Sequence, residues 1–131
     1  MLYLDSSAIV KLVVREPGTV ELVEEVRADP EIVSSALAWT EVVRAVLRSG
    51  GRPARAEAVL ERMSLVPIDD GIIRSAGRLS PTVLRTLDAI HLATALSLKS
   101  DIAALVTYDT RLTAAAADTG LAVRAPGLDP V

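Results

Sequence analysis

The stretch Leu87-Asp88-Ala89-Ile90-His91-Leu92-Ala93-Thr94-Ala95-Leu96-Ser97-Leu98 is the most informative part of the sequence for the fold. Its apolar residues cover nearly the whole circumference of a helix, which is typical of a helix at the centre of a domain. Asp88 falls in the first turn of this helix, where an isolated carboxylate is costly unless it is paired, caps the helix or binds a metal ion. Asp88 is therefore a candidate functional residue, and Thr86 is expected to cap the helix.

Around this helix, short apolar runs rich in β-forming residues alternate with helical patterns, which is the signature of a parallel α/β sheet. The expected strands are residues 2–4, 32–34, 65–68, 105–107 and 121–124. The sequence thus predicts an α/β fold with a central, mainly parallel sheet of about five strands. No repeat or linker divides the chain, so we expect a single domain over residues 1–131.

Two further helices have recognisable boundaries. Thr19, which follows Pro17-Gly18, is expected to cap an early helix. A later helix ends at Gly50-Gly51 and has apolar residues at i, i+3, i+4, i+7 and i+8, which predict one buried stripe. The stripe consists of Trp39, Val42, Val43, Val46 and Leu47.

Glu41 lies on the face of this helix opposite the predicted stripe, with Arg44 and Arg48 three and seven residues further along. Taken alone, Glu41 is better explained by a surface ion pair with Arg44, which would contribute little to stability. Glu41 becomes a candidate site residue only when it is considered together with the other carboxylates of the chain.

The composition limits the kinds of site that the chain can hold. There is no cysteine, so a metal ion must be bound by oxygen or by His91, the single histidine, and this favours a hard cation. The net charge of −3 argues against a general binder of polyanions. The N-terminus lacks the pattern of a signal peptide, and no apolar run approaches the roughly 18 residues of a membrane span. We therefore expect a cytoplasmic protein.

The charges are distributed unevenly along the chain. Residues 16–31 contain six acidic residues and Arg27 as their only basic one, whereas eight arginines lie between residues 44 and 85. Solvated helix faces explain any one of these arginines, but as a group they are suited to bidentate contacts with phosphates. Arg44, Arg48 and Arg85 are the candidates for such contacts.

Asp5 and Asp109 each directly follow an expected strand. Ligands of open parallel sheets bind at the carboxyl ends of the strands, so both carboxylates would meet in one crevice if their strands are neighbours. The simpler explanation for each is an aspartate that opens a loop or caps a helix, and Asp5 suits a cap of the helix that starts near Ser6. This simpler explanation accounts poorly for Asp88.

Four segments, taken together, resemble the PIN-domain ribonucleases, most closely the VapC-type toxins of toxin–antitoxin pairs. They are Leu4-Asp5-Ser6-Ser7, Trp39-Thr40-Glu41-Val42, residues 87–93 and Thr107-Tyr108-Asp109-Thr110-Arg111-Leu112. Each segment alone is weak evidence for the family, but the four segments in this order and at this spacing are specific to it. The resemblance covers essentially the whole chain. It implies a PIN-like three-layer α/β/α fold.

The resemblance also implies the site residues. The family's acidic positions correspond to Asp5, Glu41, Asp88 and Asp109. Ser6 and Thr107 match small hydroxyl residues that would orient ligands or waters around the site. The same match makes His91 a structural residue of its helix rather than a general base.

Four carboxylates brought together repel one another, so some would stay protonated unless a divalent cation neutralises them. Mg²⁺, or Mn²⁺ as a substitute, suits such oxygen ligands, and it can activate water and polarise a phosphate without a side-chain nucleophile. The expected function is a Mg²⁺-dependent endoribonuclease, the toxin of a type II toxin–antitoxin system. Whether one or two ions bind is left open.

The partners implied by the resemblance are an RNA substrate, a cognate antitoxin protein and a second copy of the chain in a homodimer. For the antitoxin, the acidic stretch carries an apolar stripe that predicts a groove for a helix or strand. The stripe consists of Val20, Leu22, Val23 and Val26.

Three alternatives stay open. Related acidic sites also cut DNA, so the chain could be a metal-dependent DNA nuclease, although it has no added elements for gripping DNA. It could also be a catalytically silent PIN-like interaction module, against which the intact acidic positions count. A phosphoaspartate enzyme that uses Asp5 is more distant, because it would want a second aspartate where this chain has Ser7.

Overall fold

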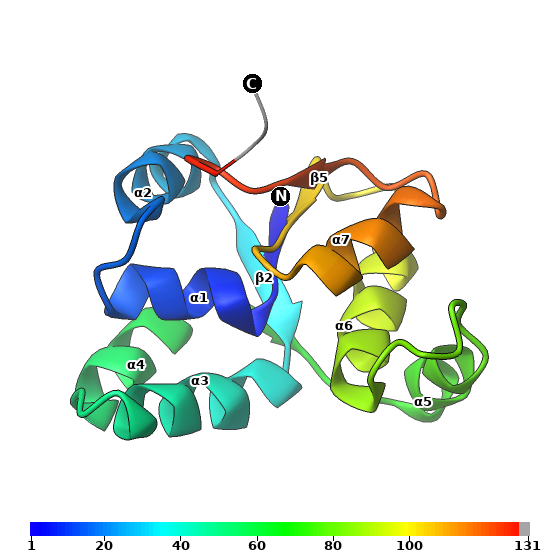
Figure 1. Cartoon of the computed structure of the whole chain (residues 1–131), viewed down its shortest axis with the longest axis horizontal. Helices are drawn as coiled ribbons and strands as arrows, with labels where there is room; N and C mark the ends of the chain where they lie inside the picture. Colours follow the sequence, from blue (N-terminus) through cyan, green and yellow to red (C-terminus); the bar gives the residue numbers. More distant parts are fainter. Residues whose placement is uncertain (129–131) are drawn as a thin grey trace.

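Five short parallel strands form the centre of the computed structural model, which describes residues 1–128 (Figure 1). They are β1 (Leu2–Leu4), β2 (Ile32–Ser35), β3 (Ser64–Val66), β4 (Ala104–Val106) and β5 (Val123–Arg124). Their order in the sheet is β3-β2-β1-β4-β5, and each neighbouring pair is parallel. The predicted α/β fold with a five-stranded parallel sheet is therefore confirmed. The predicted single domain ran to residue 131, and residues 129–131 lie outside the described part.

Seven helices connect and flank these strands within residues 1–128. They are α1 (Ser6–Val13), α2 (Thr19–Ala28), α3 (Leu37–Arg48), α4 (Pro53–Leu60), α5 (Asp70–Gly77), α6 (Thr86–Ser97) and α7 (Thr110–Ala117). Helices α1, α3 and α4 pack together on one face of the sheet, and α6 and α7 cover the other (Figure 1). This is the three-layer α/β/α arrangement that the resemblance implied. Among these helices, none is long and apolar enough to cross a membrane.

The central strand β1 contributes side chains to the hydrophobic cores on both faces of the sheet, because successive side chains of a strand point to opposite faces. Leu2 and Leu4 enter the core under α1 and α3, whereas Tyr3 enters the core under α6 and α7. All three residues are buried, so β1 is fixed on both sides. The loop that follows β1 is therefore held on a rigid support.

Two strands are shorter than predicted. Strand β3 ends at Val66, two residues before the expected end, because Pro67 has no amide hydrogen for the ladder. Strand β5 contains only Val123 and Arg124, since Leu121 is used to fill the core before the strand begins. Neither difference affects the carboxyl ends of the central strands.

Both predicted threonine caps are wrong by one residue. Helix α2 begins at Thr19 itself, with Gly18 at the cap position in a left-handed conformation (φ 94°). The Thr19 hydroxyl instead donates to the carbonyl of Lys11, which ties the start of α2 to α1. Helix α6 likewise begins at Thr86, and its cap position is held by Arg85, whose side chain makes no capping hydrogen bond.

The buried stripe of α3 is rotated relative to the prediction. Val42 and Val46 are fully buried as expected, but Trp39 is 36% and Leu47 is 52% exposed. Ala38 takes their place in the core, since a small side chain lets the helix approach α1 closely. Glu41 consequently lies at the margin of the buried stripe rather than opposite to it, which turns its side chain towards the edge of the sheet.

Helix α6 is buried over its middle, as predicted. The five consecutive residues from His91 to Ala95 are all buried, so no face of the helix is exposed at this level. The prediction fails at the N-terminal end, where Leu87 is 46% exposed. This exposed first turn is the part that carries Asp88.

Candidate active site at the carboxyl edge of the sheet

Asp5 and Asp109 lie side by side at the carboxyl ends of β1 and β4. The two strands are neighbours, with Leu4 opposite Val106, and the Asp5 amide donates to the Val106 carbonyl at 3.1 Å. Each aspartate also caps the helix that follows it: Asp5 caps α1 and Asp109 caps α7. The capping role and the shared crevice, treated as alternatives from the sequence, occur together.

Asp5 is the most deeply placed carboxylate of the site, with only 3% of the residue exposed. Its Oδ1 accepts hydrogen bonds from the Ser7 hydroxyl at 2.6 Å and the Ala8 amide at 3.0 Å, and its Oδ2 accepts one from the Thr107 hydroxyl at 2.6 Å. Burial raises the pKa of Asp5, although His91 and these hydrogen bonds act in the opposite direction. A buried carboxylate that is destabilised in this way is suited to a cation.

Glu41 approaches the same edge from α3. Its Oε1 accepts hydrogen bonds from the Ser6 hydroxyl at 2.5 Å and from His91 Nε2 at 2.7 Å. Burial on its own would raise the pKa of Glu41, but the hydrogen bonds from His91 and Ser6 and the charge of His91 together lower it. Within residues 1–128 the ion pair of Glu41 is with His91, so the alternative of a surface pair with Arg44 is wrong.

Asp88 and Asp109 share one arginine. The Arg85 Nε lies 3.3 Å from Asp88 Oδ2, and its Nη2 lies 3.3 Å from Asp109 Oδ2. Burial raises the pKa of Asp88, the negative charge of Asp109 raises it further, and Arg85 counteracts both. The side chain of Arg85 is 63% exposed, so this bridge is open to solvent.

Sequence reasoning missed the direct contact of His91 with a site carboxylate. His91 is only 2% exposed, and besides Glu41 it contacts the hydroxyl of Tyr3 through Nδ1 at 2.8 Å. The available signal was its spacing, because a residue three positions after Asp88 lies on the same side of α6. His91 therefore links the core to one of the predicted site residues.

Ser7 was also missed as a site residue. Its hydroxyl donates to Asp5 and accepts a hydrogen bond from the Tyr108 amide at 3.0 Å, so it connects the first turn of α1 to the segment after β4. The two predicted hydroxyl residues do contact the carboxylates, Ser6 at Glu41 and Thr107 at Asp5. Ser7 could have been suspected because it is the next hydroxyl after Ser6.

The carboxylates do not form a ready-made set of metal ligands. In the part of the chain that the structure describes, no group of three or more histidine, aspartate and glutamate side chains is arranged to hold an ion. The physical reason is visible at Asp88 and Asp109, where Arg85 already supplies the positive charge. The donor set nevertheless fits a hard cation, because it offers carboxylate oxygens around a buried, destabilised Asp5.

Arg44 and Arg48 are exposed on α3, and no ion pair with a site carboxylate is recorded for either within residues 1–128. Their guanidinium groups are therefore available to other anions. Arg85, the third predicted phosphate contact, is instead bound to Asp88 and Asp109.

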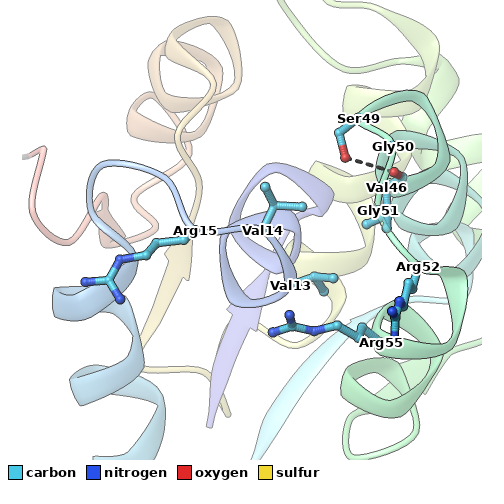
Figure 2. A pocket seen from close by; sticks show the side chains of 9 residues that line it. All are labelled: Val13, Val14, Arg15, Val46, Ser49, Gly50, Gly51, Arg52 and Arg55. Carbon is cyan, nitrogen blue, oxygen red and sulfur yellow. Dashed lines mark hydrogen bonds between the residues drawn. The ribbon is translucent and has the colours of Figure 1, made fainter.

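Two hollows lie away from the acidic edge. One of about 390 Å³ lies where α1 and α3 end and α4 begins, and its lining contains three arginines and no carboxylate (Figure 2). Arg15 extends away from the other lining residues in this view. The second, of about 290 Å³, is an apolar groove beside α1, α2 and α4 whose lining includes Val23 and Val26. Two members of the predicted partner stripe thus line a groove, whereas Leu22 is buried in the core and Val20 is exposed outside it.

Comparison with known proteins identifies the family. Residues 2–118 match the PIN domain. Ribonuclease VapC46 of Mycobacterium tuberculosis is 49% identical over 126 residues, which cover 95% of this chain and 97% of the relative. The solved structure of Mycobacterium tuberculosis VapC20, described as a sarcin-ricin loop cleaving toxin, has a TM-score of 0.72 at 14% identity and covers 92% of this chain and 96% of its own. A toxin-antitoxin complex from Klebsiella pneumoniae has a TM-score of 0.68 at 22% identity, with 87% and 91% covered. This chain therefore belongs to the PIN-domain family, as a full-length homologue of VapC ribonucleases.

Proposed function

We propose that the chain is a magnesium-dependent endoribonuclease and the toxin of a type II toxin–antitoxin pair. The observation that carries this proposal is the meeting of Asp5 and Asp109 at the carboxyl ends of β1 and β4, with Asp88 and Glu41 brought to the same edge. The relative that supports an RNA substrate is named a ribonuclease and is similar over nearly its whole length.

The residues proposed to hold Mg²⁺, or Mn²⁺ in its place, are Asp5, Glu41, Asp88 and Asp109. A divalent cation there supplies charge neutralisation of the scissile phosphate and activation of water. Thr107 and Ser7 fix both oxygens of Asp5, so that carboxylate keeps its orientation. Ser6 does the same for one oxygen of Glu41.

Arg85 has a different part in this proposal. Its guanidinium neutralises Asp88 and Asp109 when no other cation is near them, and its exposure allows it to move away. Once released, it joins Arg44 and Arg48 as a contact for the phosphates of RNA, since arginine pairs with phosphate in a bidentate manner.

The partners in this proposal are an antitoxin protein and a second copy of the chain. The apolar groove that Val23 and Val26 line is the surface proposed for an antitoxin helix or strand. Trp39 and Leu47 on α3 are exposed apolar side chains that a homodimer would cover. The proposed location is the cytoplasm.

The deciding experiment compares matched RNA and DNA oligonucleotides with the purified protein in EDTA and in millimolar Mg²⁺. We expect cleavage of RNA only, and only with Mg²⁺. Preferential cleavage of DNA would replace the proposal with a DNA nuclease. Cleavage of neither, across several RNA pools, would support a catalytically silent module.

The toxin role has a separate test in growing cells. Expression of the wild-type chain should arrest growth, and co-expression of a cognate antitoxin should relieve the arrest. Asp5→Asn is the matched control, because it keeps the shape of the side chain and loses the charge. Normal growth with abundant soluble wild-type protein would contradict the toxin role while leaving the nuclease activity in place.

A further inference from the structure

A continuous series of hydrogen bonds runs from the core to the acidic edge. The Tyr3 hydroxyl lies 2.8 Å from His91 Nδ1, and His91 Nε2 lies 2.7 Å from Glu41 Oε1. The three residues come from β1, α6 and α3, so they join the central strand to both helical layers. Tyr3 and His91 are buried. A histidine with a purely structural role would find its partners in the core, whereas this one ends on a carboxylate of the site.

The ring of His91 has little freedom to turn. It packs edge-on against Tyr3 with an interplanar angle of 80° and 6.0 Å between the ring centroids. The Ser6 hydroxyl lies 3.2 Å from Nε2 and also donates to Glu41, so two donors converge on one carboxylate oxygen. Within residues 1–128 no hydrogen bond is recorded for the other oxygen, Oε2. The arrangement fixes Oε1 of Glu41 through two contacts.

We propose that Tyr3 and His91 are positioning residues, which hold Glu41 Oε1 so that the carboxylate of Glu41 is presented to a divalent cation. The identity of the cation and its use in cleavage rest on the proposed function, whereas the hydrogen bonds that hold Glu41 do not. Neither residue contacts the substrate in this proposal. The reason is general: groups that orient a ligand side chain reduce the freedom that would otherwise be lost on binding.

The positioning role is tested by two replacements of similar size. His91→Gln keeps a donor that can reach Glu41, whereas His91→Leu removes it. We expect His91→Leu to lower both kcat and the affinity for the cation by about 10- to 100-fold, as is common for outer-shell partners, with little change in KM for RNA. His91→Gln should recover part of that loss. Tyr3→Phe should cost about tenfold or less, because the donor to Glu41 remains.

The cation affinity is measured independently of cleavage, as the Mg²⁺ concentration that gives half of the maximal thermal shift. Tyr108→Phe is the matched control, since it removes a phenol whose hydroxyl donates to the Pro126 carbonyl at 2.8 Å. That control should keep wild-type kcat and Mg²⁺ midpoint.

The outcomes separate this inference from the proposed function. If the wild type cleaves RNA and His91→Leu retains its kcat and Mg²⁺ midpoint, the positioning role is wrong and the function stands. Equal losses in His91→Gln and His91→Leu, in step with lower melting temperatures, would show a purely structural histidine. If the wild type cleaves nothing, the function fails, but the Mg²⁺ midpoints of the wild type and the variants still decide the role of His91. Should His91→Leu not fold, a wild-type Mg²⁺ midpoint in a folded Tyr3→Phe variant would overturn the positioning role.

Discussion

Asp5 and Glu41 are held by hydroxyl, amide and imidazole groups, whereas Asp88 and Asp109 are bridged by one exposed arginine. The donors to the first pair, such as Thr107 and His91, are buried in the core and cannot leave without cost. Arg85 can exchange with solvent or with another cation, since an exposed ion pair contributes little to stability.

This difference indicates that the two pairs of carboxylates would have different roles in binding a cation. Asp5 and Glu41 are pre-organised, so they set the position of a cation. Asp88 and Asp109 change partners, from Arg85 to the cation, when one binds.

Removing the charge of Asp5 or Asp88 should nearly abolish cleavage. Asp5→Asn and Asp88→Asn keep the shape of the side chain and lose a full ligand charge. Their loss in kcat should therefore exceed the roughly 10- to 100-fold expected for an outer-shell partner. The measurement is single-turnover cleavage of an RNA oligonucleotide in Mg²⁺, with circular dichroism to show that the fold is intact. Wild-type rates in a folded variant would refute the site assignment.

Asp109→Asn should have a milder effect on the same assay. Asp109 Oδ1 is already used to cap α7 through the amides of Arg111 and Leu112, and an asparagine retains this cap. Only Oδ2 is then available to a cation, directly or through water. A loss as large as that of Asp88→Asn would mean that the last acidic position is as essential as the others.

Part of this site and of the fold around it could be predicted from the sequence. The meeting of Asp5 and Asp109 followed from a general rule, because the carboxyl ends of neighbouring parallel strands share one edge. The buried middle of α6 followed from its uniformly apolar composition. The rotation of α3 did not, because Ala38 counts weakly in an apolar pattern although it packs closest to the core.

Contacts between layers were beyond the reach of the sequence. Glu41 and His91 meet because α3 and α6 approach the edge from opposite faces of the sheet, and no local pattern encodes that approach. The Arg85 bridge depends on the conformation of the segment between α5 and α6. The sequence therefore supplied the identity of the carboxylates better than the identity of the groups that hold them.

Loss of the Arg85 charge should strengthen cation binding. Arg85→Gln removes the competitor at Asp88 and Asp109, so the Mg²⁺ midpoint should fall by a few-fold, roughly the factor of 5 that 1 kcal/mol represents. If Arg85 also contacts phosphates, KM for RNA should rise in the same variant. Arg48→Gln is the matched control, because no carboxylate partner of Arg48 is recorded within residues 1–128. An unchanged midpoint in Arg85→Gln would show that the bridge does not compete with the cation.

The smallest expected effect is on thermal stability, and it tests the site without any knowledge of the RNA. The pKa values of Asp5 and Asp88 are raised in the folded state. Their contribution to the free energy of unfolding is therefore complete below the unfolded aspartate pKa and is lost as the pH rises through the folded values. Glu41 has a lowered pKa, so its contribution has the opposite sign and is lost as the pH falls through its folded value.

Mg²⁺ should reverse the loss at Asp5 and Asp88. A ligand that binds only the folded state at about ten times its Kd stabilises it by about 1.4 kcal/mol, which corresponds to roughly 3 to 6 °C in Tm for a domain of this size. Asp88→Asn should raise the metal-free Tm slightly, since it removes a carboxylate that repels Asp109, and it should reduce the shift with Mg²⁺. Both proteins are melted at pH 7.5 in EDTA and in millimolar Mg²⁺ at constant ionic strength. If wild type and variant shift equally, the response comes from general ion effects on the surface, and these carboxylates are not the binding site.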